Sequence, residues 1–252
     1  MTFSNSPPWI LATNDDGVEA QGLRALEQAL HPLGQVFSVA PTSERSGASH
    51  SISVRRGLRC EQAGERRWSL DGTPADCVIA AMSHLLVFPP SLVVSGINHG
   101  GNMGRNIHYS GTVGAAAEAT LHGLPAMAVS LCAKAPADFS KAAKLAAHLG
   151  ARILQLPPQK FPEGCMLNVN IPLVWNGEVR ATRAYRRHSR TMMSQLDDRE
   201  GLWVREAVDW EMAPPDSDLR AIDESAASVS VIEVYPTANG AREFDLQALL
   251  ID

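Results

Sequence analysis

Short apolar runs alternate with stretches of helical periodicity along the first two thirds of the chain, and this alternation restricts the fold more than any other feature. Buried strands are predicted at residues 9–13, 36–40, 92–95, 126–131 and 166–170. Between them, residues 23–30 and 145–153 carry apolar side chains three or four positions apart, which is typical of helices. Strands separated by helices of this length pair in parallel through right-handed crossovers. The sequence therefore predicts an α/β fold with a mostly parallel sheet flanked by helices.

The segment between the second and third predicted strands has features of its own. Residues 52–71 are expected to form short antiparallel or edge strands. A strong helix start follows, with Thr73 as the N-cap, Pro74 at the first helical position and an acid, Asp76, at the third. This helix is expected to end near Leu86, before two consecutive prolines.

The pattern changes near residue 173. Strands are expected there without helices between them, at residues 179–185, 202–208 and 228–235, with polar stretches at 189–200 and 213–217. We interpret residues 1–172 as the α/β core that carries the functional site, and residues 173–252 as a β-rich C-terminal extension packed on that core. The extension includes a long arm without a core of its own, which predicts packing on a partner subunit.

Composition and charge narrow the functional classes. The 252-residue chain has a formal net charge of −5 and is 45% hydrophobic, so nothing global draws it to nucleic acid. Its four cysteines form no CxxC pair, and the N-terminal segment lacks the features of a signal peptide. No apolar stretch approaches the ~20 residues needed to cross a bilayer. We therefore expect a cytoplasmic protein without a nucleic-acid or membrane partner.

Small polar residues, carboxylates and glycines follow the first three strands of the predicted core. Ligands bind beyond the carboxyl ends of the strands in an open parallel sheet, so these residues are expected to meet at one rim. The segments are residues 14–17 after the first strand, 45–49 after the second, and 96–112 after the third.

The adjacent acids Asp15 and Asp16 are the clearest candidate metal ligands. Two neighbouring carboxylates on a tight turn repel each other unless a positive charge lies beside them. The alternative is a solvated turn that caps the helix after it, which is common for an Asn-Asp-Asp-Gly sequence. Ser46 and Asn98 would add neutral oxygens, and this all-oxygen set suits Mg²⁺, Mn²⁺ or Ca²⁺ better than zinc.

A phosphate site is predicted beside the metal. Residues 95–104 are rich in glycine and asparagine, and they lead through Tyr109 into Ser110, Gly111 and Thr112 at the start of an Ala-rich helix. Free N–H groups and the helix dipole favour an anion at such a helix start, although both hydroxyls could simply cap the helix. Asn102 and Gly47 are further candidates for contacting the phosphate or its ester.

Other sequence features give weaker indications. The chain lacks a Walker A motif, a GxGxxG after the first strand, and a GxSxG nucleophile elbow. A basic cluster near the C-terminal extension could bind phosphate or a nucleic-acid backbone, although such runs more often form a solvated or interface surface. Its members are Arg183, Arg186, Arg187, His188 and Arg190.

Five segments together resemble one known family. They are NDDG at 14–17, RSGAS at 45–49, GTPADCV at 72–78, SGIN at 95–98 and YSGTV at 109–113, with Glu118 after the last. In this order and spacing they resemble the SurE family, the survival-protein-E 5'-nucleotidases, over roughly residues 9–172.

The resemblance implies a Rossmann-like core with a swapped C-terminal extension, assembled as a homodimer or homotetramer. It implies hydrolysis of nucleoside 5'- and 3'-monophosphates, and in some members of short polyphosphate, with one divalent cation per subunit. The metal ligands carried over are Asp15, Asp16, Ser46 and Asn98.

The expected mechanism is attack of a cation-activated water on the phosphate. An aspartate would orient the water, and Asn14 or Asn102 would position the ester. A phosphoaspartate formed on Asp15 is the rival route. A module that binds nucleotide or phosphate without turnover is the alternative function, and a nucleic-acid-binding protein is a third.

Overall fold

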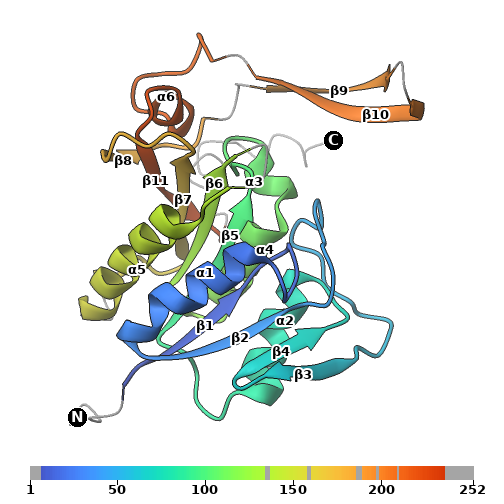
Figure 1. The fold of residues 1–252 in the computed structure, drawn as a ribbon, viewed down its shortest axis with the longest axis vertical. Coiled ribbons are helices and arrows are strands. Elements are labelled where there is room, and N and C mark those ends of the chain that lie inside the picture. Colours follow the sequence, from blue (N-terminus) through green and yellow to red (C-terminus); the bar gives the residue numbers. More distant parts are fainter. Residues whose placement is uncertain are drawn as a thin grey trace, which may run out of the picture.

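A nine-stranded sheet forms the centre of the molecule in the computed structural model. The structure describes residues 7–133, 137–157, 160–185, 189–196, 199–208 and 210–235. The strand order is β3-β4-β2-β1-β5-β6-β7-β11-β8, and the six strands from β4 to β7 in this order run parallel. The strands are β1 (Trp9–Thr13), β2 (Gln35–Pro41), β3 (Cys60–Gly64), β4 (Arg67–Leu70), β5 (Leu92–His99), β6 (Ala126–Cys132), β7 (Cys165–Pro172), β8 (Val179–Thr182) and β11 (Ala227–Glu233). The predicted α/β class is confirmed (Figure 1).

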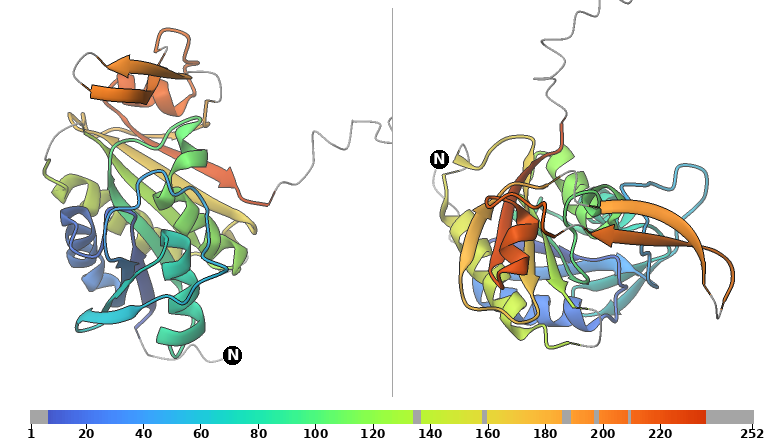
Figure 2. Two further views of the ribbon diagram at one scale, coloured as in Figure 1. Left: turned by 90° about the vertical axis from the view of Figure 1, so that its right-hand side faces the viewer. Right: turned by 90° about the horizontal axis from the view of Figure 1, so that it is seen from above.

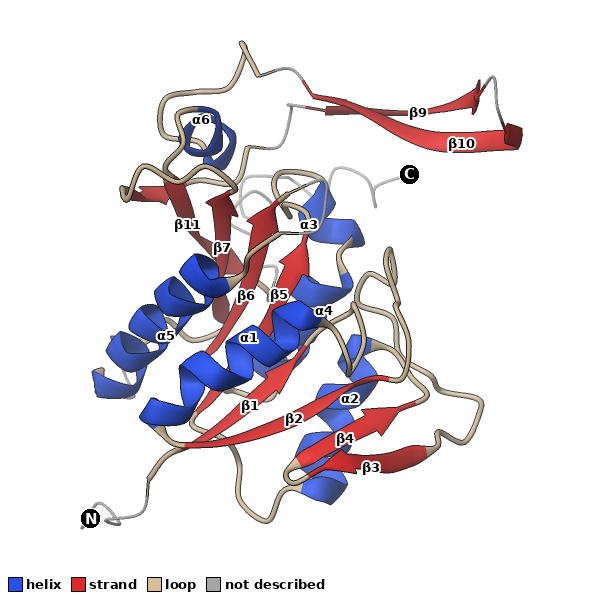
Figure 3. Ribbon diagram, viewed as in Figure 1, coloured by secondary structure: helices blue, strands red, loops and turns tan. Residues whose placement is uncertain are grey.

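Helices cover both faces of the sheet, and each face has its own apolar core. On one face lie α1 (Gln21–Leu30) and α5 (Ser140–Gln155). Their leucine and alanine side chains pack against every second residue of the central strands. On the other face lie α2 (Pro74–Ala80) and α4 (Gly111–Leu121), separated by the sheet from α1 and α5 (Figures 1 and 3). Alternation along a strand sends neighbouring side chains to opposite faces. Continuous apolar strands are therefore what this two-sided burial requires.

The order in which successive strands are added to the sheet reverses at β1. The chain moves from β1 to β2 on one side, and after β3 and β4 it returns to place β5 on the other side of β1. The carboxyl ends of β1 and β5 therefore border the crevice where open α/β sheets bind ligands. In the β1–β5 register, Thr13 lies opposite Ser95, so the segments that follow both strands start from the same rim.

The predicted features between residues 52 and 86 are largely confirmed. Strands β3 and β4 pair antiparallel, with β3 at the sheet edge. Helix α2 begins with a capping box, in which Thr73 accepts from the Asp76 N–H while Asp76 accepts from the Thr73 N–H. The helix continues as one wider turn, Ala81–Leu85, which ends next to the predicted end at Leu86.

Three predicted boundaries were wrong. Strand β5 continues to His99, so Asn98 lies within a strand and not in the loop after it. A short helix, α6 (Asp218–Asp223), precedes β11, where we expected strands without helices between them. The polar stretch at 189–200 contains strand β9 (Ser189–Leu196). At β5 and α6, pairing or packing with segments distant in the sequence outweighs the local composition, whereas β9 pairs with the chain that directly follows it, residues 199–208.

The C-terminal part contributes to the main sheet and also leaves it. Strand β11 pairs antiparallel with β7, and β8 adds to β11, so both extend the central sheet. Strands β9 and β10 (Arg199–Val208) pair with each other in a separate two-stranded hairpin, which extends away from the body (Figure 2). The division into a core and an extension at residue 172 stays a prediction. In the described part of the chain, no helix is long and apolar enough to cross a membrane.

Candidate metal and phosphate site

The turn after β1 is closed by its own asparagine. Asn14 is fully buried, and its Oδ1 accepts a hydrogen bond from the Gly17 N–H (3.2 Å) while its Nδ2 donates to the Gly17 carbonyl (2.9 Å). Gly17 has a φ of +105°, which L side chains rarely adopt. Asn14 therefore shapes the turn that presents the two aspartates, and its role in positioning the ester stays a prediction.

Asp15 is held against the start of α4. The residue is 4% exposed, and its carboxylate accepts a 2.5 Å hydrogen bond from the Thr112 hydroxyl. Its backbone carbonyl accepts from the Arg45 N–H (2.7 Å), which ties the segment after β2 to the same turn. A Cβ added at Gly111 would lie 2.9 Å from the Asp15 Cβ, so only glycine allows this approach. The turn therefore meets two of the segments that we expected at this rim.

Asp16 reaches the third segment. Its Oδ2 accepts from the backbone N–H of His99, the residue after Asn98, at 3.3 Å. Burial, and then the negative charge of Asp15, raise the pKa of Asp16 from 3.8 to about 6. Burial also raises the pKa of Asp15, against the hydrogen bond from Thr112. Both shifts express the cost of burying a carboxylate with little water around it, and at Asp16 the neighbouring charge of Asp15 adds to that cost.

A divalent cation fits the chemistry of these donors. Among the described residues, no Lys, Arg or His forms an ion pair with Asp15 or Asp16. The charge of His99 lowers the pKa of Asp16 but is outweighed by burial and by the charge of Asp15, so the pair is incompletely neutralised. The same residues contain no group of three or more His, Cys, Asp or Glu able to hold a metal. A cation here would therefore depend on neutral oxygens and water, the ligands that Mg²⁺ and Mn²⁺ accept.

The two predicted neutral ligands lie next to residues that touch the aspartates. Ser46 follows Arg45, and its exposed hydroxyl donates to Glu44 (2.6 Å). The Asn98 Nδ2 donates to the Gly100 carbonyl (2.7 Å). Both side chains therefore stand at the rim, with their present hydrogen bonds made to close neighbours. Their role as ligands stays a prediction.

The predicted phosphate cradle is a true helix N-terminus. Ser110 is the N-cap of α4 and accepts from the Val113 N–H at 3.1 Å, so the capping alternative describes its hydroxyl. The hydroxyl of Thr112 is used by Asp15. Gly47, in the segment that follows β2, has a φ of +74°, and an added Cβ there would meet nothing within 4 Å. The N–H groups of the helix start are engaged as well, because those of Gly111 and Thr112 interact with the Asp15 carboxylate and those of Val113 and Gly114 bond to Ser110. A phosphate site at this helix start stays a prediction.

Asn102 occupies a buried network that sequence reasoning missed. Its side-chain Nδ2 donates to Ser130 (2.9 Å), and its backbone carbonyl accepts from Asn168 (2.8 Å) and Asn170 (3.1 Å). The Asn170 Oδ1 in turn accepts from the Asn102 N–H (2.8 Å). The signal was present in β7, where two asparagines alternate within an apolar run and therefore share one buried face.

The basic cluster is only partly described. Arg183 forms an exposed ion pair with Asp216 (3.3 Å), and the three residues at 186–188 lie outside the described residues. No role for this cluster follows from the contacts of Arg183.

The doubly wound sheet, with a carboxylate turn at its switch point, defines an α/β protein of the Rossmann-like class. The chain belongs to the SurE family, because the family described as "Survival protein SurE" matches residues 10–193. This confirms the resemblance stated from the sequence.

Individual relatives agree along almost the whole chain. A protein named 5'-nucleotidase SurE from Methylococcus capsulatus is 43% identical over 231 residues, which are 89% of this chain and 91% of that protein. Another of the same name from Moorella thermoacetica is 39% identical over 252 residues, covering 96% and 95%. The crystal structure of the SurE protein from Aquifex aeolicus superposes with a TM-score of 0.86 at 30% identity, covering 97% of this chain and 100% of that one.

Proposed function

We propose that this protein is a 5'-nucleotidase, a divalent-metal-dependent phosphomonoesterase that hydrolyses nucleoside 5'-monophosphates to nucleoside and phosphate. The observation that carries the proposal is the Asp15–Asp16 pair at the β1 switch point, packed against the N-terminus of α4. The relatives named 5'-nucleotidase SurE support the substrate class. We extend the proposal to 3'-monophosphates and short polyphosphate as further substrates.

Each part of the rim has a distinct task in this proposal. Asp15 and Asp16 would hold one Mg²⁺ or Mn²⁺ per subunit, together with oxygens of Ser46 and Asn98. The cation would neutralise phosphate charge and activate water. The N–H groups around Gly47 and at the start of α4 would bind the phosphate oxygens, where the helix dipole favours an anion.

The chain's own contacts determine how accurately these groups are placed. Asn14 closes the turn, and Thr112 orients the Asp15 carboxylate, so one oxygen of Asp15 is committed to the protein. Asp15 is therefore less available as a nucleophile, and we favour water as the attacking group. Trapping a phosphoaspartate after rapid quench would reverse this choice.

Release of inorganic phosphate from a panel of nucleoside monophosphates tests the proposal. We expect turnover with Mn²⁺ or Mg²⁺, none with EDTA, and loss of turnover in Asp16→Asn. Asp138→Asn, an exposed acid before α5, is the matched control and should retain wild-type activity. Nucleotide binding by calorimetry without phosphate release would instead favour a binding module.

We further propose a homodimer or homotetramer formed through the C-terminal extension. The β9–β10 hairpin pairs with no other strand of the described chain, and apolar side chains on it are exposed. A cytoplasmic location stays a prediction from the sequence.

A further inference from the structure

The loop between β5 and α3 (Asn106–Tyr109) has no regular structure, so its path depends on contacts with other parts of the chain. It begins at Gly100, whose carbonyl accepts from the Asn98 Nδ2, and its end leads through α3 to the Ser110 cap. The orientation of the Asn98 amide and the start of α4 both depend on this loop. Asn98, at the first end, is a proposed ligand of the cation, and the start of α4, at the other end, is the proposed phosphate site.

The first half of the loop is fixed to the sheet. Gly100 donates to the Leu131 carbonyl (2.9 Å), and Asn170 pairs with both the N–H and the carbonyl of Asn102. At Gly101 an added Cβ would lie 2.7 Å from the Cys132 sulfur. This half of the loop therefore rests directly on β6 and β7.

The second half is held by an acid from the C-terminal part of the chain. Asp218, the first residue of α6, is fully buried, and its Oδ2 accepts from the Gly104 N–H (3.2 Å). Its Oδ1 accepts from the Tyr185 N–H (3.0 Å) and from the N–H of Leu219 (2.9 Å). A buried carboxylate is costly unless it is hydrogen-bonded, so these N–H groups and the acid depend on one another.

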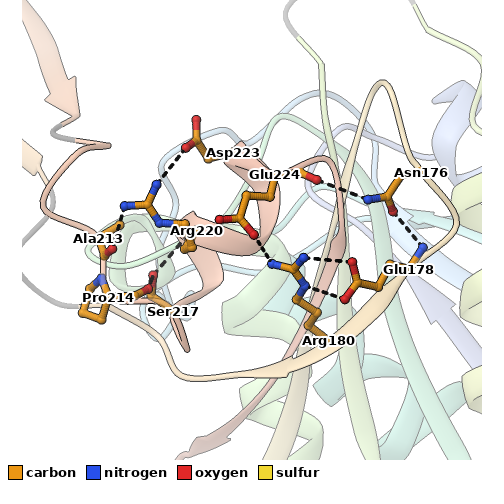
Figure 4. Close-up of polar contacts among 9 residues, drawn as sticks. All are labelled: Asn176, Glu178, Arg180, Ala213, Pro214, Ser217, Arg220, Asp223 and Glu224. Carbon is orange, nitrogen blue, oxygen red and sulfur yellow. Dashed lines mark hydrogen bonds and ion pairs between the residues drawn. The ribbon is translucent and has the colours of Figure 1, made fainter.

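Asp218 also lies where the chain enters and leaves the β9–β10 hairpin. Tyr185 precedes the hairpin, and Asp218 donates its own N–H to the Arg183 carbonyl (2.9 Å). The returning segment is braced separately, because Arg220 of α6 donates to the Ala213 carbonyl and Arg180 bridges Glu178 and Glu224 (Figure 4). The position of α6, and hence of the Asp218 carboxylate, is therefore well defined.

We propose that Asp218 is a positioning residue for the proposed nucleotidase reaction. It holds Gly104, and through the loop it keeps Asn98 and the α4 N-terminus in register with the Asp15–Asp16 turn. It touches neither substrate nor cation in this arrangement. The same carboxylate joins the root of the β9–β10 hairpin to the loop, because it accepts from both the Tyr185 and the Gly104 N–H. This inference rests on the function proposed above.

Hydrogen exchange of the metal-free protein and Mn²⁺ binding test the proposal together. Asp218→Asn replaces one acceptor oxygen by an NH₂ group, and Asp218→Ala removes both. We expect faster amide exchange in residues 100–109, unchanged exchange in β1, β5 and β6, and Mn²⁺ affinity reduced about tenfold, as for other groups that orient metal ligands. The effect should be larger for alanine, and kcat/KM should fall in parallel.

Asp223→Asn is the matched control, because Asp223 ends the same helix in a surface ion pair with Arg220. The proposal would be overturned if both Asp218 variants showed the same loop exchange and the same Mn²⁺ affinity as this control. Faster exchange throughout the sheet would also overturn it, because Asp218 would then be a general stability residue. Wild-type protein that binds Mn²⁺ but releases no phosphate would refute the proposed function alone, and the loop and affinity measurements would still decide this inference.

Discussion

At the scale of single residues, the closeness of Gly111 to Asp15 determines what the site can hold. An added Cβ at residue 111 would meet the Asp15 Cβ at 2.9 Å and its Oδ2 at 3.0 Å. Alanine has a higher helix propensity than glycine, so propensity alone would make Gly111→Ala stabilising. The contact with Asp15 reverses that expectation for activity.

We expect Gly111→Ala to lower kcat/KM by roughly 100-fold, since a shift of about 1 Å at a reacting group has effects of that size. Phosphate release under saturating Mn²⁺ measures the change. Gly57→Ala is the control, because a Cβ there would meet nothing within 4 Å. Equal activities of both variants would show that the approach of Gly111 to Asp15 is not needed.

The pH dependence of stability is a second consequence of the paired acids. The pKa of Asp16 is raised to about 6 in the fold, above its ordinary value of 3.8. A raised carboxyl pKa means that the contribution of Asp16 to stability is fully present below pH 3.8 and is lost as the pH rises through about 6. A bound cation would remove this penalty.

In EDTA, we therefore expect Asp16→Asn to become progressively more stable than wild type between pH 4 and pH 8. Melting temperatures of both proteins across this range provide the measurement. Added Mn²⁺ should stabilise wild type above pH 6 and leave the variant nearly unchanged. A constant difference between the two proteins at all pH values would contradict the assigned environment of Asp16.

At the scale of elements, the start of α2 is the most strongly specified helix terminus. Asp76 accepts from the N–H groups of Thr73 (2.8 Å) and Ser53 (2.9 Å), which joins the helix to the loop before β3. Burial opposes ionisation of Asp76, but these hydrogen bonds outweigh it and lower its pKa below 3.8. The local capping sequence and the tertiary contact therefore reinforce one another.

Loss of this cap should be costly only while Asp76 is ionised. We expect Asp76→Ala to reduce the free energy of unfolding by about 1–2 kcal/mol at pH 7. Because the folded pKa is lowered, this contribution is present above pH 3.8 and is lost as the pH falls through the folded value. Urea denaturation at pH 7 and pH 3 measures both, and a cost that persists at acid pH would argue against the charged cap.

At the scale of the whole molecule, the β9–β10 hairpin has apolar side chains that the described part of a single chain does not cover. Met193, Leu202 and Val204 are 64%, 68% and 66% exposed, and two-stranded hairpins are marginally stable without a surface to pack on. Exposed apolar strands of this kind mark association surfaces. A second copy of the chain would cover them.

We expect wild-type protein to elute as a dimer or tetramer, and Leu202→Glu/Val204→Glu to dissociate it. Each side chain contributes about 1.5–3 kcal/mol when buried, so the double change should weaken association roughly 100-fold or more. Light scattering coupled to size exclusion measures the mass. Val174→Glu, an exposed apolar position outside the hairpin, should leave the assembly intact. A monomeric wild type would contradict the proposed role of the extension.

The sequence by itself determined the features that depend on near neighbours. Apolar periodicity placed the core strands and helices, because side chains repeat every two residues in a strand and every 3.6 in a helix. The capping box of α2 and the Asn14–Gly17 turn also lie within four residues of chain. The position of the Asn14–Gly17 turn at the end of β1 indicated the rim of the site, because parallel strands present their carboxyl ends together.

Only the tertiary structure decided which distant groups meet. Asn102 is 68 residues from Asn170, and Gly104 is 114 residues from Asp218, so no local pattern relates the members of either pair. Helix α6 was missed for the same reason, because it packs against β8 and β11. Strand β9 was missed because its polar sequence suggested irregular chain, although its partner β10 is adjacent in the sequence. Apolar burial has a period that can be read along the chain, whereas a buried hydrogen bond depends on where two distant segments end up in space.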